Sequence, residues 1–273
     1  MKTISRREFV ALTAVPFAVP GVLQPAAAPT AQDVVDRLKQ KLGIEWKTDG
    51  VDTFKAGDPM TPVKGIATSA MATLDVLKQA VKAGANFVIT SEPTFYSKSD
   101  AVKADPIFTA KNEFIRKNQL VVWRFSDHWR QRTPDPFTIG LSDTLGVISP
   151  TTLEALVSNV KKKLNSRGGI RVVGDPKLTV AKVGLLPGTT TVQAALNLFP
   201  SVDVIIAGEV REWETVELAR DKVTAGERKG LVLLGRVVSE NPGMNECAKW
   251  LKDVVPEIHT TWIPVDDPYW RPA

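Results

Sequence analysis

Short apolar runs alternate with longer amphipathic segments along most of this chain, and this alternation constrains the fold more than any other feature. The apolar runs have the length of strands, and the longer segments repeat their apolar residues with helical spacing. Strands that alternate with helices are joined by crossover connections, which place the strands mostly parallel. The sequence therefore predicts an α/β fold with mostly parallel sheets.

The same theme occurs in each half of the chain, with no low-complexity linker between the halves. The predicted strands are residues 63–67, 86–90, 120–125, 180–186, 202–207, 231–234 and 257–265. The predicted helices are residues 31–41, 74–83, 107–118, 151–164, 191–199, 212–222 and 245–254. We expect one domain with two similar lobes, at about residues 29–150 and 151–273.

The composition is ordinary for a globular protein with a sizeable core, since 43% of the residues are hydrophobic and 24% are charged. No run of lysine and arginine is long enough to follow a nucleic-acid backbone, so no nucleic-acid partner is expected. Cys247 is the only cysteine, which excludes an intramolecular disulfide. The only histidines are His128 and His259, so a site built mainly from imidazoles is excluded as well.

The first 28 residues have the three parts of a secretory signal, which are a charged start, an apolar middle and a small-residue end. Adjacent Arg6 and Arg7, followed by Phe9, are typical of the twin-arginine type. Prolines interrupt the apolar stretch, which argues against a membrane span and against a basic amphipathic helix. We therefore expect a twin-arginine signal peptide over residues 1–28, cleaved or kept as a tether. The twin-arginine export machinery would then deliver the folded protein to the periplasm or another extracytoplasmic site.

Acidic side chains follow four of the predicted strands, and these acids are Glu92, Asp127, Glu209 and Glu240. In open α/β sheets, ligands bind beyond the carboxyl ends of the strands. If these ends adjoin, the carboxylates converge, and converging carboxylates need a proton or a cation between them. A divalent cation such as Mn²⁺, Mg²⁺, Ca²⁺ or Zn²⁺ would meet that need. The candidate metal ligands are Glu92, Asp127, His128 and Glu240.

Each of these residues also has a purely structural interpretation. Asp127 could cap the turn that follows it, and a lone histidine such as His128 is more often a packed, hydrogen-bonded side chain than a ligand. Glu209 could bond the start of the next helix, and Glu240 could cap a helix that begins after Pro242. The metal hypothesis therefore depends on acids recurring at equivalent strand ends.

The same strand ends carry a resemblance to a known family. Residues 63–86 are similar to its first crossover unit, residues 203–209 to its Gly-Glu strand end, and residues 235–243 to its final signature. Along most of residues 34–260 the chain resembles the Nif-three-like proteins, also called type 2 GTP cyclohydrolase I homologues or dinuclear-metal-centre hexameric proteins. The resemblance implies the Nif-three-like α/β fold, a metal centre and a ring-like homo-oligomer.

The family's metal ligands are matched only in part. Where the family has two histidines before a proline, this chain has Ser91 and Glu92. The family's last histidine falls on Arg236, and its glutamate falls on Glu240. Arginine would place a fixed positive charge where a cation should sit. Three outcomes stay open: one metal on the candidate ligands, no metal with Arg236 neutralising the carboxylates, or a different ligand in the same cleft.

Two functions are therefore predicted. The first is metal-assisted hydrolysis of a small polar substrate, in which Glu240 or Glu92 accepts a proton from metal-bound water. Ser91, Glu209 and Arg236 would then act as binding residues. The second is a non-catalytic, metal-depleted binding protein or oligomeric scaffold, which would not need the ligands.

The end of the chain combines aromatic residues and prolines, including Trp262, Tyr269 and Trp270. Such a tail is interpreted as a strap over the protein's own core. The alternative is that it packs on a neighbouring subunit or lines a pocket.

Overall fold

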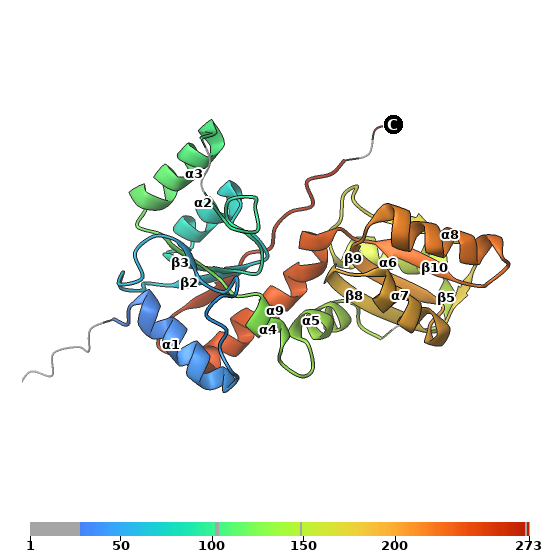
Figure 1. The fold of residues 1–273 in the computed structure, drawn as a ribbon, viewed down its shortest axis with the longest axis horizontal. Coiled ribbons are helices and arrows are strands. Elements are labelled where there is room, and N and C mark those ends of the chain that lie inside the picture. Colours follow the sequence, from blue (N-terminus) through green and yellow to red (C-terminus); the bar gives the residue numbers. More distant parts are fainter. Residues whose placement is uncertain (1–27, 102–103, 148, 271, 273) are drawn as a thin grey trace, which may run out of the picture.

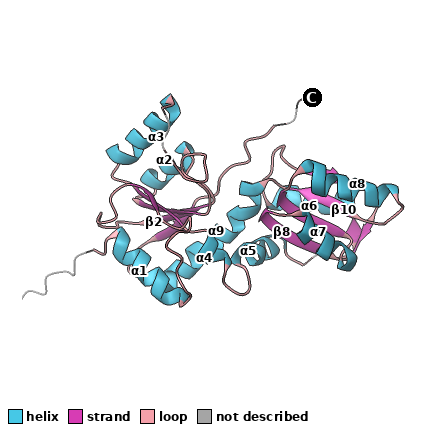
Figure 2. Cartoon of the chain, viewed as in Figure 1, coloured by secondary structure: helices cyan, strands magenta, loops and turns pink. Residues whose placement is uncertain are grey.

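Two sheets lie towards opposite ends of the molecule, with helices packed between them (Figure 1). The structure is a computed structural model that describes residues 28–101, 104–147, 149–270 and 272. Figure 2 distinguishes the helices from the strands in the same view. The predicted signal peptide, residues 1–28, lies outside the described residues except for Ala28.

The first sheet has five strands, and four of them are parallel. The strands are β1 (Phe54–Ala56), β2 (Ile66–Ser69), β3 (Phe87–Thr90), β4 (Val121–Arg124) and β11 (Thr260–Trp262). Their order is β1-β4-β3-β2-β11, and β1 is antiparallel to β4. The last strand of the chain therefore lies at one edge of the first sheet.

Helices cover both faces of this sheet, which is why its central strands are apolar at nearly every position. On one face α1 (Ala31–Leu42) and α9 (Arg236–Val254) pack against Ile66, Phe87, Ile89, Val121 and Trp123. On the other face α2 (Leu74–Lys82) and α3 (Pro106–Lys117) pack against Ala67, Val88 and Val122. Successive residues of each strand thus serve opposite layers.

The second sheet has four strands in the order β6-β10-β9-β8. Their bounds are Arg171–Val173, Gly230–Leu233, Val204–Glu209 and Val183–Thr189, and only β6 is antiparallel to its neighbour. Helices α5 (Pro136–Leu145) and α6 (Leu153–Lys163) cover one face, and α7 (Val192–Leu198) and α8 (Glu217–Thr224) cover the other. The short strands β5 (Thr151–Thr152) and β7 (Thr179–Val180) form a separate pair.

The two lobes are joined through α9, which begins directly after β10 of the second sheet and ends in the core of the first. It packs against α5 so closely that a Cβ on Gly140 would lie 2.4 Å from the carbonyl oxygen of Pro242. The short helix α4 (Asp127–Arg130) lies next to this contact (Figure 1). Because α9 and β11 return to the first sheet, the two sheets do not divide the chain at one point near residue 150.

The predicted fold class is confirmed, and all seven predicted strands are present with some shift of their ends. The largest difference concerns α9, which begins at Arg236 rather than at Asn245 and contains Pro242 inside its second turn. The prediction that Glu240 caps a helix after Pro242 is wrong, because Glu240 lies within α9. Within the described residues, no helix is both long and apolar enough to cross a membrane.

Candidate functional site at the junction of the two sheets

The carboxyl ends of strands from both sheets meet at the first turns of α9. Ser91 and Glu92 follow β3 of the first sheet, while Gly188 is the second-last residue of β8 in the second sheet. The backbone of Gly188 has φ +79°, and a Cβ there would lie 2.6 Å from Glu240 Oε1. Only glycine fits this approach, so the junction is closed tightly around Glu240.

Two carboxyl groups and two guanidinium groups form the centre of the site. Arg236 Nε donates to Glu92 Oε1 at 2.7 Å and lies 3.9 Å from Glu240 Oε1. Arg130 Nη2 lies 3.4 Å from the same Glu240 oxygen. The Ser91 hydroxyl donates to Glu240 Oε2 at 2.8 Å. We call Ser91, Glu92, Arg130, Arg236 and Glu240 the junction cluster.

The carboxyl groups of the junction cluster are buried, with Glu92 5% and Glu240 2% exposed. Burial, followed by the nearby charge of Glu240, raises the pKa of Glu92 to about 8, although the Arg236 charge opposes this shift. Glu92 is therefore largely protonated at pH 7, which reduces the negative charge at the centre of the site.

His128 is held in a hydrogen-bonded pair rather than presented to the site. Its Nδ1 lies 2.7 Å from Asp52 Oδ2, and its Nε2 accepts the backbone N–H of Lys47 at 3.0 Å. The ring is 1% exposed and stacks on Trp46 at 3.7 Å between centroids. Both ring nitrogens are thus engaged, so the expectation that His128 ligates a metal is not met.

Asp52 was not identified from the sequence, although it organises the start of α4. Its carboxylate accepts the backbone N–H groups of residues 126, 127 and 128 in addition to the His128 ring. It lies in a loop rich in glycine, aspartate and proline, where no spacing distinguishes it from its neighbours. Its role depends on a contact between segments more than 70 residues apart.

The remaining predicted residues separate into two groups. Asp127 is exposed and lines the same cleft as Glu92 and Arg236. Glu209 ends β9 on the second sheet, is exposed, and accepts the Thr189 hydroxyl at 3.3 Å. The structure therefore brings together Ser91, Glu92, Arg236 and Glu240, with Asp127 near the edge and Glu209 outside the cleft lining.

A cleft of about 720 Å³ opens beside the junction cluster. The polar residues in its lining are Glu92, Tyr96, Ser97, Lys98, Arg124, Asp127 and Arg236. Its size is in the range of small-molecule sites. Arg124, the last residue of β4, was not identified from the sequence because it follows a buried apolar run.

The residues at the junction do not fit a metal centre. Among the described residues, no group of three or more histidine, cysteine, aspartate and glutamate side chains is arranged to hold an ion. The Arg236 guanidinium contacts the two carboxyl groups that a cation would need, and arginine cannot lose its proton in a protein. Arginine thus takes the place beside the two carboxyl groups that a cation would need.

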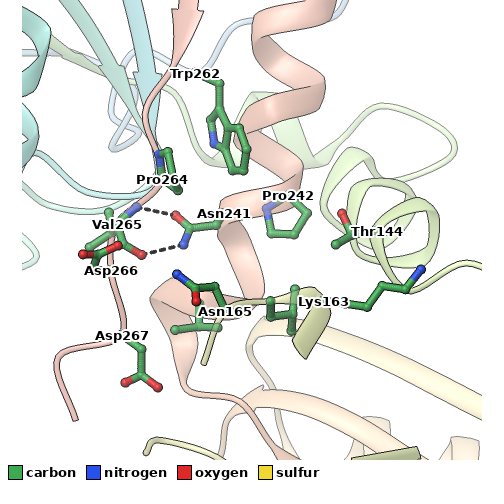
Figure 3. A pocket seen from close by; sticks show the side chains of 12 residues that line it. Thr144, Lys163, Asn165, Asn241, Pro242, Trp262, Pro264, Val265, Asp266 and Asp267 are labelled. Carbon is green, nitrogen blue, oxygen red and sulfur yellow. Dashed lines mark hydrogen bonds between the residues drawn. The ribbon is translucent and has the colours of Figure 1, made fainter. Parts of the chain in front are cut away.

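A smaller cavity, of about 140 Å³, lies beneath residues 263–270, which we call the C-terminal strap (Figure 3). The Asn241 side chain exchanges two hydrogen bonds with the backbone of Val265, at 2.8 and 3.0 Å. Further along the strap, Asp267 Oδ2 accepts the Ser166 hydroxyl at 2.6 Å and the N–H groups of residues 167, 168 and 169 at 2.9, 3.2 and 3.0 Å. The strap therefore ties α9 to the loop after α6.

Fold and site together define a class: a two-lobed α/β protein with a buried carboxylate cluster where the two sheets meet. Residues 135–268 match the family model described as Duf34/NIF3 (NGG1p interacting factor 3). The chain is also 24% identical over 257 residues to the GTP cyclohydrolase 1 type 2 homolog of Chlamydia pneumoniae, covering 87% of this chain and 98% of the relative. These matches show a similarity to the NIF3 family over the second half of the chain and to one relative over most of it.

Solved structures agree in fold at low sequence identity. A hypothetical protein of Staphylococcus aureus has a TM-score of 0.70 at 15% identity, covering 89% of this chain and 99% of that one. A Bacillus cereus protein related to NIF3 has a TM-score of 0.70 at 14% identity, with the same coverage. These similarities show that the chain shares its α/β fold with these proteins.

Proposed function

We propose that this protein is a metal-independent binding protein of the NIF3 family, and that the cleft beside the junction cluster takes a small polar ligand. The observation that carries the proposal is the position of Arg236, which contacts Glu92 and approaches Glu240. A divalent cation bound to the same carboxyl groups would be repelled by that guanidinium. The cleft, by contrast, is open and of ligand size.

Metal content tests the proposal directly. The protein, folded in the cytoplasm and purified without chelators, is expected to contain less than about one-tenth equivalent of any divalent metal by mass spectrometry. The variant Arg236→Ala is expected to bind Mn²⁺ or Zn²⁺ more tightly than wild type, because it removes the competing charge. Arg211→Ala is a control with the same charge change at an exposed residue. A stoichiometric metal in the wild-type protein contradicts the proposal.

Metal-independent hydrolysis is a second candidate, favoured by the raised pKa of Glu92. Glu240 would accept a proton from water, and protonated Glu92 would donate one to the leaving group. Phosphoesterase and amidase substrates would be screened with wild type and Glu92→Gln. Activity that falls above about pH 8 and is lost in Glu92→Gln supports catalysis, and activity unaffected by that change contradicts it.

Export through the twin-arginine pathway is part of the proposal. It is supported by adjacent Arg6 and Arg7 and by the apolar stretch that follows them. The full chain is expected outside the cytoplasm after fractionation of a bacterial host, and the double variant Arg6→Lys, Arg7→Lys is expected to remain inside. Equal distribution of the two proteins would refute export by this route.

A homo-oligomer is the final element of the proposal. Two aromatic side chains of the C-terminal strap, Tyr269 and Trp270, are 62% and 75% exposed, and Trp213 is 73% exposed. Exposed aromatic residues of this kind are enriched at protein interfaces. Light scattering after gel filtration is expected to give a mass above that of one chain, and a monomer at micromolar concentration contradicts this.

A further inference from the structure

Arg124 is a buried cation whose guanidinium is only partly bonded. It ends β4 and is 5% exposed, and its Nε donates to the carbonyl oxygen of Ser91 at 2.9 Å. Its Nη1 is buried and has no hydrogen-bond partner among the described residues. An unpaired buried polar group is unfavourable, and a charged one more so. The guanidinium therefore lacks part of the bonding that its burial demands.

The nearby acids already have other partners. Glu92 is paired with Arg236, and Asp100 lies 4.0 Å from Lys55 Nζ. Burial is the main cause that lowers the pKa of Lys55, and the positive charge of Arg124 lowers it further. The two cations therefore lie close enough to repel each other. Arginine cannot relieve the repulsion by losing its proton. This end of the cleft thus carries an excess of positive charge.

The cleft gives an anionic ligand access to Arg124. Arg124 belongs to the lining, and Lys98, which is exposed, lines the same space. Tyr96 adds a half-exposed ring, held by an edge-on contact with Phe108 at 5.5 Å between centroids. The backbone of Tyr96 has φ +60°, a left-handed conformation that is strained for a side chain of this size. A flat apolar wall therefore stands beside two cations.

We infer that this end of the cleft is an anion subsite, in which Arg124 and Lys98 bind the carboxylate or phosphate group of a small molecule whose body lies against Tyr96. The guanidinium fork matches two oxygens of either anion. The inference rests on the proposed binding function and names the class of ligand. Glu92 and Asp127, which line the same cleft, would contact polar groups of the same molecule.

Matched pairs of probes test the inference. Benzoate and phenyl phosphate supply the two anions on a flat body, and benzamide and phenol are their uncharged counterparts. Calorimetric titration of the wild-type chain is expected to detect binding of benzoate, phenyl phosphate or both. The affinity for the bound anion should exceed that for its neutral counterpart by a factor of about ten or more, which corresponds to about 1.4 kcal/mol. The preferred anion distinguishes a carboxylate ligand from a phosphate ligand. Neutral probes that bind equally well, or no binding of either anion at millimolar concentration, overturn the inference.

Variants locate the subsite. Lys98→Gln is expected to weaken anion binding several-fold without changing the fold, whereas Lys252→Gln, on the exposed side of α9, is the matched control and should leave binding unchanged. Arg124→Gln, which removes the charge, is expected to abolish the anion preference, and if this variant does not fold, Lys98→Gln and the neutral probes still decide. Anion binding that is unchanged in both Lys98→Gln and Arg124→Gln refutes the subsite but leaves the metal-independent function standing. A stoichiometric metal whose removal abolishes anion binding refutes the proposed function instead.

Discussion

Replacing Asp267 by asparagine is expected to loosen the attachment of the C-terminal strap to the second lobe. The Asp267 carboxylate is 5% exposed and accepts four hydrogen bonds from residues 166–169 on one oxygen. The other oxygen accepts the N–H of Tyr269 at 3.0 Å. Asparagine has the same shape but carries no charge, and its amide nitrogen cannot accept a hydrogen bond.

The size of the effect follows from the pKa of Asp267. Burial alone would raise this pKa, but the Ser166 hydroxyl and the backbone N–H groups outweigh burial and lower it from 3.8 to about 2. That difference corresponds to about 2 kcal/mol of preference for the charged form in the folded state. For a domain of this size, the loss of about 2 kcal/mol lowers the melting temperature by roughly 4–8 °C.

The pH dependence gives a second measure of the same interaction. Because the pKa is lower in the folded protein, the stabilisation is complete above about pH 4 and is lost as the pH falls through about 2. Urea denaturation between pH 7 and pH 2.5 is therefore expected to show the gap between wild type and Asp267→Asn narrowing with acidity. Hydrogen exchange of the N–H groups of residues 167–169 should be faster in the variant at pH 7.

Asp266→Asn is the control, because this neighbouring carboxylate is 62% exposed and makes only a surface ion pair with Arg167. Such pairs contribute about 0–1 kcal/mol. Equal stability of Asp267→Asn and Asp266→Asn, or a gap that does not change with pH, would refute the claim that the carboxylate anchors the strap.

Three further predictions concern the junction cluster and its supports. Because folding raises the pKa of Glu92, the wild-type protein is expected to lose stability as the pH rises from about 4.5 to 8. Glu92→Gln should lack this decline and be at least as stable as wild type at pH 8, which chemical denaturation at a series of pH values measures. Gly188→Ala is expected to cost about 1–3 kcal/mol by chemical denaturation, since its Cβ would meet Glu240 Oε1 at 2.6 Å. His128→Phe is expected to cost about 2–4 kcal/mol, because it leaves the buried Asp52 carboxylate without its imidazole partner, and thermal unfolding by circular dichroism is the check.

The fold was readable from the sequence because both faces of the central strands are covered, which makes them continuous apolar runs of strand length. The meeting of Glu92 and Glu240 was expected only if strand ends from the two halves adjoin; the structure brings these two side chains together but leaves Glu209 outside the cleft lining. The start of α9 was missed because Pro242 lacks the N–H that a helix interior requires. Its position inside the helix is stabilised by packing against α5, which only the tertiary structure reveals.

The parts of the site that sequence reasoning missed depend on distant contacts. Asp52 engages His128 across 76 positions of the chain, and nothing in the spacing of either residue indicates the pair. The unsatisfied nitrogen of Arg124 is a property of its surroundings, not of its neighbours in the chain. The return of β11 to the first sheet likewise requires a crossover whose destination no local pattern specifies.

The first turns of helix α9 lie at the cleft, and its last turns lie in the core of the first lobe. Helix α5 packs against α9, and the C-terminal strap is hydrogen-bonded both to α9 and to the loop after α6. Within the part of the chain that the structure describes, these contacts tie the two lobes together, and we expect little hinge motion between them. A ligand would meet a ready-made shape, so we expect association at a rate set by diffusion and charge rather than by domain closure. The radius of gyration measured by X-ray scattering should then be the same with and without ligand.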